Sequence, residues 1–231
     1  MRIDVLTIFP DLFPGPLGAG VVGRALEQDV VSLQAHDLRD FTDDRHRQVD
    51  DIPFGGGPGM VLKPEPLIRA VRSFRAEDAG ARVILMSPQG RRLDQAYARE
   101  LAGESHLVLV CGRYQGVDER AREEIGEELS IGDYLLSGGE LAAMVVVEAV
   151  ARLVPGTLGS HESLNEETFT DRGFEPPLYT RPASFEGREV PEVLRSGHHA
   201  AIDRWRREQS EERMRRRRPD MVRDGATAGG I

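Results

Sequence analysis

The stretches VLVCGRYQG (residues 108–116) and IGDYLLSGGE (residues 131–140) decide most of what this sequence predicts. Each is an apolar segment that runs directly into glycines, which leave backbone N–H and C=O groups uncovered by side chains. Two such loops favour a site that holds a small molecule through the backbone. Neither stretch reads G-x-G-x-x-G or G-x-x-x-x-G-K-[ST], so the defining residues of the common dinucleotide and triphosphate sites are missing.

Short apolar segments alternate with helical patterns around these two stretches. This alternation predicts an α/β fold with a largely parallel sheet. A further helix, at residues 140–154, carries apolar side chains on nearly every side, so we expect one face to pack on the sheet and another on a partner subunit. The other expected elements are strands at residues 5–9, 30–35, 82–86 and 107–111 and helices at residues 64–75 and 94–102.

Composition and charge favour a folded protein of the cytoplasm. With 231 residues and 39% hydrophobic content, the chain is long enough for one α/β domain and a smaller appendage. A formal charge of −9 argues against indiscriminate nucleic-acid binding. The single cysteine, Cys111, allows no internal disulfide and is expected to be a buried structural thiol in a reducing cytosol. No apolar run is long enough for a secretory signal or a membrane span, so we expect no membrane partner.

The pattern predicts three regions: an α/β domain at residues 1–158, a linker or lid at 159–174, and a basic, helical C-terminal domain at 175–231. The linker is polar and lacks periodicity. Residues 204–218 contain eight arginines and three glutamates, a local excess of five positive charges. That helix is either an RNA-binding surface or a solvated charged helix whose apolar side is anchored by Trp205.

Three glycine- or proline-containing loops follow expected strands within about fifty residues: SPQGRRLD (87–94), CGRYQG (111–116) and SGGE (137–140). Ligands collect at the carboxyl ends of strands in open α/β sheets, so a shared site is favoured over three ordinary turns. A fourth glycine run, IPFGGGPGM (52–60), follows Arg45, His46 and Arg47. It fits either close approach of a phosphate or base, or a surface loop with a tight turn.

In this order, VDDIPFGGGPGM, LMSPQGRRLDQ, LVCGRYQGVDER, SIGDYLLSGGEL, ARLVPGTLG and YTRP resemble the bacterial tRNA (guanine-N1)-methyltransferases of the SPOUT class, from Ile8 to about Met221. The resemblance implies a deep trefoil knot, an exception to unknotted topology. It also implies a homodimer with composite active sites, and methyl transfer from S-adenosylmethionine to N1 of the guanosine just 3′ of the anticodon, position 37 of the tRNA. The alternatives are a SPOUT enzyme acting elsewhere on RNA, such as a ribose 2′-hydroxyl, and a non-catalytic RNA-binding relative.

The resemblance assigns S-adenosylmethionine binding to three loops whose main-chain groups hold the ligand. The matching residues are Met86, Ser87 and Pro88; Gly112, Tyr114 and Gln115; and Ile131, Gly132, Asp133, Tyr134, Leu135, Leu136, Gly138 and Gly139. Gln115 departs from the family's glutamate. The exchange removes a negative charge near the donor and puts in doubt the Mg²⁺ dependence that the family implies, and no residue is assigned as a metal ligand.

Methylation of guanine N1 requires a base for its proton and a cation for the charge that develops on O6. By resemblance, Arg152 is the O6 partner. Glu167 is the base, in place of the family's aspartate, and Glu166 is a weaker candidate. Without the resemblance, both glutamates would be solvated linker acids.

The tRNA itself is expected to contact the linker and the C-terminal domain. By resemblance, Glu175 helps to position the target base, and Ser163 falls at a matched linker position. Arg215, Arg216, Arg217 and Arg218 are expected to bind phosphates, so affinity should fall steeply with salt.

Overall fold

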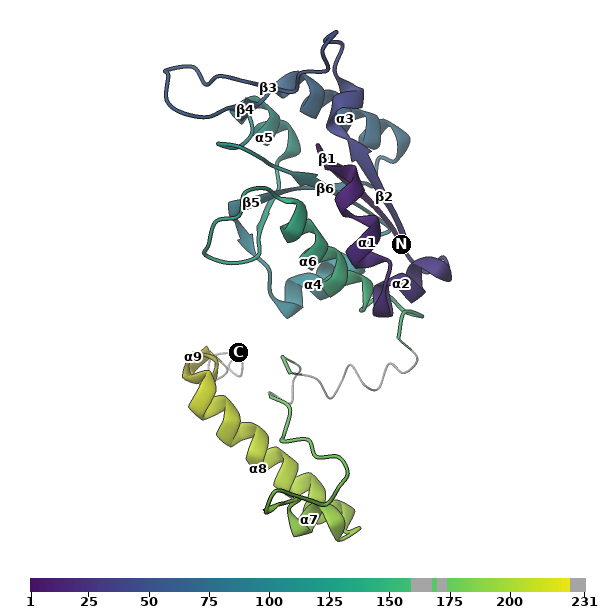
Figure 1. Ribbon diagram of the computed structural model, residues 1–231, viewed down its shortest axis with the longest axis vertical. Helices are drawn as coiled ribbons and strands as arrows, with labels where there is room; N and C mark the ends of the chain where they lie inside the picture. The colour runs from purple at the N-terminus through teal and green to yellow at the C-terminus, as the bar shows by residue number, and fades with distance from the viewer. Residues whose placement is uncertain (159–167, 170–173, 225–231) are drawn as a thin grey trace, which may run out of the picture. The chain divides into compact units, whose positions relative to one another are not determined.

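The computed structural model describes residues 1–158, 168–169 and 174–224. The chain divides into two compact units, Met1–Gly159 and Ser160–Ile231, which we describe separately (Figure 1). No helix among the described residues is long and apolar enough to cross a membrane.

The first unit is built on a five-stranded sheet in the order β2-β1-β6-β5-β7, and every neighbouring pair is parallel. All six residues of the central strand β6 are buried, as expected for an apolar run covered on both faces. The predicted α/β fold with a parallel sheet is therefore confirmed. The strands are β1 (Arg2–Thr7), β2 (Ser32–Asp37), β5 (Arg82–Arg92), β6 (His106–Cys111) and β7 (Glu128–Ser130).

Helices cover both faces of this sheet, on opposite sides in Figure 1. Side chains alternate along a strand, so Leu107 and Leu109 of β6 enter one hydrophobic core and Val108 and Val110 the other. The first core also contains residues of α1 (Pro14–Leu17), α2 (Gly20–Glu27), α4 (Gln95–Ala102) and α6 (Glu140–Ala151). The second contains residues of η2 (Leu38–Phe41), α3 (Pro64–Glu77) and α5 (Glu119–Ile125).

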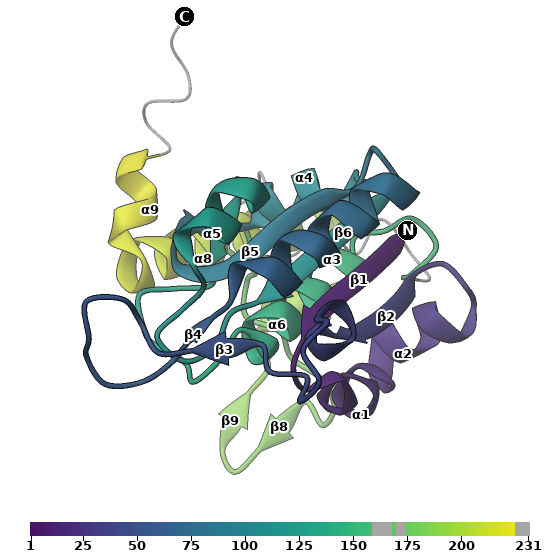
Figure 2. The ribbon, with the colours of Figure 1, turned by 90° about the horizontal axis from the view of Figure 1, so that it is seen from above.

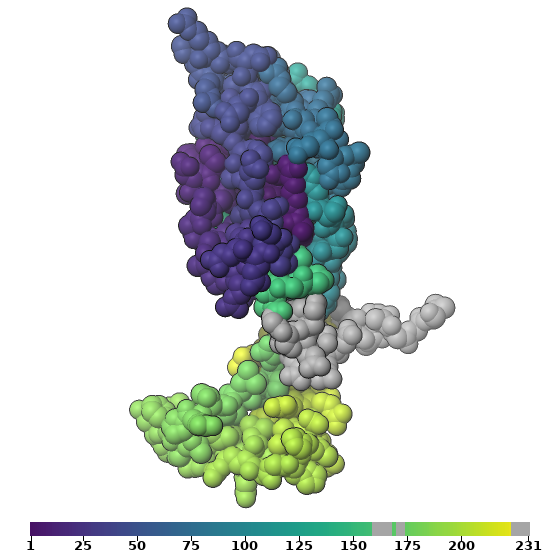
Figure 3. Space-filling model, turned by 90° about the vertical axis from the view of Figure 1, so that its right-hand side faces the viewer, coloured from purple at the N-terminus to yellow at the C-terminus, as the bar shows by residue number. Residues whose placement is uncertain are grey.

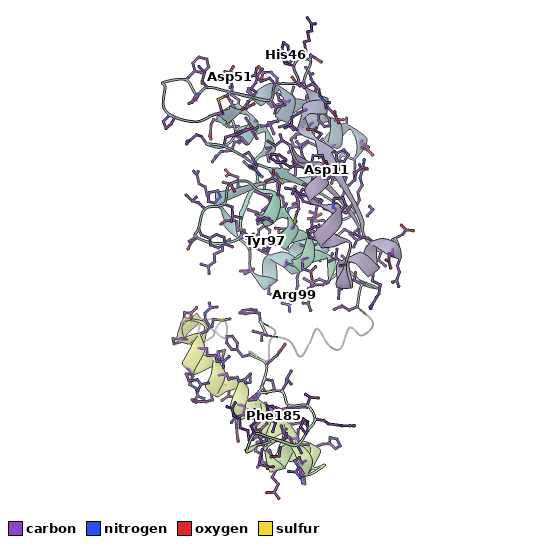
Figure 4. The ribbon with its side chains drawn as sticks, in the orientation of Figure 1. Asp11, His46, Asp51, Tyr97, Arg99 and Phe185 are labelled. Atoms are coloured by element: carbon purple, nitrogen blue, oxygen red, sulfur yellow. The ribbon has the colours of Figure 1, made fainter. Side chains whose placement is uncertain are left out.

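Local capping residues fix where α4 and α5 begin. The Asp94 carboxylate accepts a hydrogen bond from the backbone N–H of Tyr97 at 2.7 Å, and the Asp118 carboxylate accepts one from that of Arg120 at 3.0 Å. Tyr97, labelled on α4 in Figure 4, is fully buried in the first core. Helix α5 ends at Gly126, whose φ of 82° lies in the left-handed region that glycine tolerates. These caps define the first turn of both helices and the last turn of α5.

Strand β1 begins at Arg2, earlier than the sequence predicts. The prediction followed apolar residues and so left out Asp4, which is charged but buried. The strand also ends earlier, since the Thr7 hydroxyl accepts a hydrogen bond from the backbone N–H of Phe9 at 3.0 Å. The chain then enters the short 3-10 helix η1 (Pro10–Leu12). The predicted strand at residues 5–9 was therefore placed too late along the chain.

Strand β5 does not end at Met86 as predicted. Met86 and Arg91 both pair with Leu129, so residues 87–90 bulge out of a strand that continues to Arg92. A Cβ atom on Gly90 would lie 2.3 Å from the Leu129 nitrogen, so this close backbone approach requires glycine. The expected loop is thus present, but as a bulge within the strand. The short strand β7 was not predicted, because its three residues include one apolar side chain.

Helix α6 ends at Ala151, three residues before the predicted end. Ala143, Val146, Val147 and Val150 pack into the first core. Leu141 and Val145 are 59% and 46% exposed in the single chain. Helix α6 thus has a buried face and a separate exposed apolar stripe.

A buried polar network around Asp4 ties together three neighbouring strands, β1, β2 and β6. The carboxylate of Asp4 accepts hydrogen bonds from Nε2 of His36 at 2.8 Å and Nε2 of His106 at 2.7 Å. It also pairs with Nε of Arg2 at 2.6 Å. Burial by itself raises the pKa of Asp4, but the hydrogen bonds from these three side chains outweigh it and hold the pKa below its usual value. Asp4 therefore stabilises the folded chain as an anion.

We expect Asp4→Asn to lower the free energy of unfolding by about 3 kcal/mol at pH 7, because it removes the buried anion that pairs with Arg2 and accepts hydrogen bonds from His36 and His106. The folded-state pKa lies below the unfolded value of about 3.9, so the stabilisation is present above that pH and is lost as the pH falls through the folded-state pKa. Urea unfolding of wild type and variant at pH 7 and pH 3 measures this. The exposed Asp11, labelled in Figure 4, gives the control Asp11→Asn. A variant as stable as wild type at pH 7 would contradict the assignment.

The described part of the second unit consists of a hairpin and three helices. Phe185, labelled in Figure 4, pairs with Arg188 in the hairpin and is exposed. Helix α8 is fixed to the segment before it, because the Ser210 hydroxyl donates to the carbonyl of Phe174 and Nη1 of Arg213 donates to the carbonyl of Glu175. The elements are β8 (Ser184–Phe185), β9 (Arg188–Glu189), α7 (Glu192–Arg195), α8 (His199–Arg217) and α9 (Pro219–Asp224).

Candidate functional site

A cavity of about 320 Å³ lies in the first unit where β5, β6 and β7 give way to their loops. The bulge in β5, the loop after β6 and the segment between β7 and α6 converge there, so the three predicted loops do form one site. We call it the strand-end cavity. It is lined by residues 85–89, 112–117, 129–132 and 134–139 together with Arg122 and Ala142.

Thirteen of the fourteen residues assigned to donor binding line this cavity. The exception is Asp133, whose side chain is 88% exposed and lies 3.9 Å from Nη1 of Arg92. The remaining assigned residues are Met86, Ser87, Pro88, Gly112, Tyr114, Gln115, Ile131, Gly132, Tyr134, Leu135, Leu136, Gly138 and Gly139.

Backbone contacts close the cavity beside α6. The N–H of Gly139 donates to the carbonyl of Gly112 at 2.8 Å. A Cβ atom on Gly139 would lie 2.9 Å from the Cα of Cys111 and 3.0 Å from the Cβ of Met86. A side chain at position 139 would therefore force apart the ends of β5 and β6.

The glycine-rich loop at residues 52–60 is attached to the cavity wall. It connects β3 (Asp50–Asp51) with β4 (Val61–Leu62) and extends from the first unit in Figure 2. The N–H of Gln115 donates to the carbonyl of Met60 at 3.0 Å. Phe54, near the start of the loop, is fully exposed. The last residue of the loop thus contacts the cavity wall, whereas residues 54–59 are exposed.

The charged segment before this loop points away from the body of the unit. Residues 43–48 are exposed and form the blue projection in Figure 3, and Figure 4 shows His46 at its end. Nη2 of Arg47 donates to the Asp40 carboxylate, and Nη2 of Arg69 pairs with Asp43 at 2.7 Å. Ion pairs within the first unit therefore offset the charges of Arg47 and Asp43 in this segment.

Two arginines, Arg113 and Arg122, are the charged residues among those that line the cavity. Arg113 lies 3.5 Å from the buried carboxylate of Glu140 and stacks over the ring of Phe9 at 4.4 Å. The Thr7 hydroxyl donates to the same carboxylate at 2.9 Å. The positive charge of Arg113 is thus neutralised behind the cavity wall.

Sequence reasoning assigned no role to Arg113, Arg122 or Glu140. The first and last lie within the quoted loops CGRYQG and SGGE, which made them detectable. Arg122 lies outside the quoted loops, and its position at the cavity depends on where α5 begins.

Cys111 is buried beneath the cavity, as predicted. Burial raises the pKa of its thiol well above the usual range, and the nearby Glu140 carboxylate raises it further. The residue is therefore a neutral, apolar part of the core.

Arg152, the catalytic candidate that the structure describes, does not line the cavity of its own chain. Arg152 follows α6 at the end opposite Gly139, and at 1.5 Å per residue the intervening thirteen steps span about 20 Å. Glu166, Glu167 and Ser163 lie outside the described residues.

The residues assigned to tRNA lie in the second unit, and the structure places Glu175 beside α8. Its backbone N–H donates to the Thr168 hydroxyl at 3.3 Å. Arg215 pairs with Glu211 at 3.2 Å and Arg218 with Asp220 at 2.6 Å, while Arg216 and Arg217 are exposed. Among the described residues, no group of three or more His, Cys, Asp or Glu side chains is arranged to hold a metal ion.

Comparison with known proteins adds an independent observation. A family described as tRNA (Guanine-1)-methyltransferase TrmD matches residues 1–224. The similar proteins include three named tRNA (guanine-N(1)-)-methyltransferase. One, from Dictyoglomus turgidum, is 51% identical over 96% of this chain and 90% of its own length. Another, from Dehalococcoides mccartyi, is 52% identical over the same shares. The third, from Chloroflexus aggregans, is 53% identical over 99% of this chain and 90% of its own length.

Proposed function

This chain belongs to the tRNA (guanine-1)-methyltransferase family, and we propose that it transfers a methyl group from S-adenosylmethionine to N1 of the guanosine just 3′ of the anticodon, position 37 of the tRNA. The observation that carries this proposal is the coincidence of a match over residues 1–224 with a strand-end cavity formed by all three predicted loops. The names of the relatives favour guanine N1 over a ribose hydroxyl, and favour an enzyme over a non-catalytic relative.

The strand-end cavity fits S-adenosylmethionine, which supplies an electrophilic methyl group when bound. Residues 131–139 offer backbone N–H and C=O groups that suit the edges of an adenine. Met86, Ile131 and Ala142 provide apolar surface that would keep water from a sulfonium. The glycine at position 139 leaves the room that a side chain would fill.

The reaction needs two further groups. A carboxylate that accepts the N1 proton turns the guanine into a better nucleophile, and we assign this role to Glu167. A cation close to O6 stabilises the charge that develops there, and we assign this role to Arg152. Glu175 would help to position the base.

We propose a homodimer in which each active site is composite. Within one chain, Arg152 lies about 15 Å along α6 beyond Ala142, the lining residue nearest to it on this helix, which is farther than an arginine side chain reaches. A two-fold axis that pairs α6 with its copy in antiparallel orientation would bring Arg152 of the partner subunit beside the cavity end of the helix. The exposed apolar residues Phe9, Leu12, Leu141 and Val145 supply surface for such an interface.

We also propose the trefoil knot of the SPOUT class for the first unit. The support is the path of residues 131–139, which run from the edge strand β7 to α6 and contact the ends of the inner strands β5 and β6. Residues 159–174 would be a linker and residues 175–231 a tRNA-binding domain, with Arg215, Arg216, Arg217 and Arg218 on phosphates. We place the enzyme in the cytoplasm, where its substrate is found, and treat dependence on Mg²⁺ as a question for direct titration.

Isothermal titration calorimetry tests the donor site. We expect S-adenosylmethionine to bind the wild-type protein, and Gly139→Ala to weaken binding at least tenfold, because the added methyl group would lie 2.9 Å from the Cα of Cys111. Gly15→Ala is the matched control, since nothing lies within 4 Å of its added Cβ. Thermal unfolding of both variants would report any loss of folding. Failure of the wild type to bind, or full affinity in a folded Gly139→Ala protein, would refute the assignment.

A further inference from the structure

Arg122 is a charged residue of the strand-end cavity for which the proposed reaction has no role. Its Nη1 donates to Oε1 of Gln89 at 2.9 Å and lies 3.4 Å from Oε1 of Glu128. Its Nε lies 3.4 Å from Oε2 of Glu119, with no hydrogen-bond partner among the described residues. Nη2 likewise has no hydrogen bond in the described part of the chain. The side chain is thus held in place, and because Nε is buried, Nη2 is the nitrogen available to a ligand.

The cavity spans the two faces of the sheet, and Arg122 stands on one of them. Helix α5, which carries Arg122, packs its Ala121 and Ile125 into the second core. Met86 and Ala142 of the opposite wall belong to the first core, which lies across the sheet (Figure 1). A ligand that fills the cavity therefore has one end near α6 and the other near α5.

The chemistry of the two walls differs. The wall near α6 offers apolar side chains and bare backbone at Ile131, Gly139 and Ala142. The wall near α5 offers the amide of Gln89 and the guanidinium of Arg122, which are hydrogen-bonded to each other. A flat, weakly polar base suits the first wall, and a charged acceptor suits the second.

From this arrangement we propose that Arg122 binds the carboxylate of the methyl donor's amino-acid end, with Gln89 as the residue that positions the guanidinium. The inference rests on the proposed function, because S-adenosylmethionine has a single carboxylate and its adenine would occupy the wall near α6. Arg122 is then a specificity residue that distinguishes the intact donor from analogues that lack the carboxylate. Glu119 and Glu128 hold the arginine and offset its charge, which limits its repulsion of the sulfonium.

Calorimetric titration with two ligands tests the proposal: S-adenosylmethionine and decarboxylated S-adenosylmethionine, which keeps the sulfonium and the ammonium. We expect the wild-type protein to prefer the intact donor by about tenfold or more, as for a charged hydrogen bond. Arg122→Gln should abolish most of this preference by weakening only the intact donor. Arg122→Lys, which keeps the charge without the planar fork, should preserve part of it.

Arg120→Gln is the matched control, since Arg120 lies on the same helix, pairs with Asp118 at 2.8 Å and does not line the cavity. It should leave the ratio of the two affinities unchanged. Equal weakening of both ligands by Arg122→Gln would show a structural role and overturn the proposal. A wild-type protein that binds both ligands equally would also overturn it, even if the variant fails to fold. A wild-type protein that binds neither would instead overturn the donor assignment itself.

Discussion

Replacement of Glu167 by glutamine is expected to lower kcat for methyl transfer by about 10²- to 10⁴-fold, the usual contribution of a general base. Glutamine cannot accept the proton that must leave guanine N1, although it is nearly the same size as glutamate. Glu167→Asp should retain activity, because it restores the carboxylate of the family's pattern. Single-turnover assays with saturating tRNA and donor measure the chemical step without product release.

Glu166→Gln is the matched control, because the same change is made one residue earlier in the chain. It should leave kcat within a few-fold of wild type. Neither variant should alter donor affinity, since both leave the three loops to which donor binding is assigned unchanged. Equal single-turnover rates in Glu167→Gln and wild type would remove Glu167 from the mechanism, and a large loss only in Glu166→Gln would move the role to its neighbour.

Removal of the guanidinium in Arg152→Ala is expected to lower kcat by about 10²- to 10³-fold, as for loss of one group that stabilises a developing oxyanion. The composite-site proposal adds a second expectation. When Arg152→Ala and Gly139→Ala subunits are mixed and allowed to exchange, half of the dimers contain one of each. Each mixed dimer has one site with an intact cavity and an intact arginine, so about a quarter of wild-type activity should return.

The exchange experiment distinguishes the two placements of Arg152. If the arginine acted in its own chain, every site of a mixed dimer would lack one component, and activity would stay at the level of the separate variants. Exchange can be followed by differently sized tags on the two subunits. A protein that stays monomeric at micromolar concentration would contradict the composite site directly.

The sequence predicts best those elements whose pattern is local. The apolar run of β6 identifies a buried central strand, and Asp94 and Asp118 mark helix starts through their own hydrogen bonds. What it misses depends on distant partners. The carboxylate of the buried Asp4 accepts hydrogen bonds from His36 and His106, which are far apart in sequence and meet only in the fold. The continuation of β5 past Met86 depends on Gly90 meeting the backbone of β7.

In the candidate site, too, local sequence patterns are predictable and contacts between distant residues are not. The loops that line the strand-end cavity could be assigned because their glycine-rich motifs are read directly along the chain. Asp133 falls outside the cavity although it lies within such a motif, since the motif does not determine which way each side chain points. Arg122 could not be found, because only the fold brings α5 beside the bulge in β5. The distance from Gly139 to Arg152 follows from α6 being a continuous helix.

Methyl transfer to tRNA transcripts is the most direct test of the proposed function. Two transcripts, identical except for guanosine or adenosine at position 37, are incubated with the protein and labelled S-adenosylmethionine, and the products are digested to nucleosides and analysed by mass. We predict 1-methylguanosine from the guanosine transcript and no incorporation into the other. A methyl group on a ribose or at another position, or no incorporation by a protein that binds both donor and tRNA, would contradict the account.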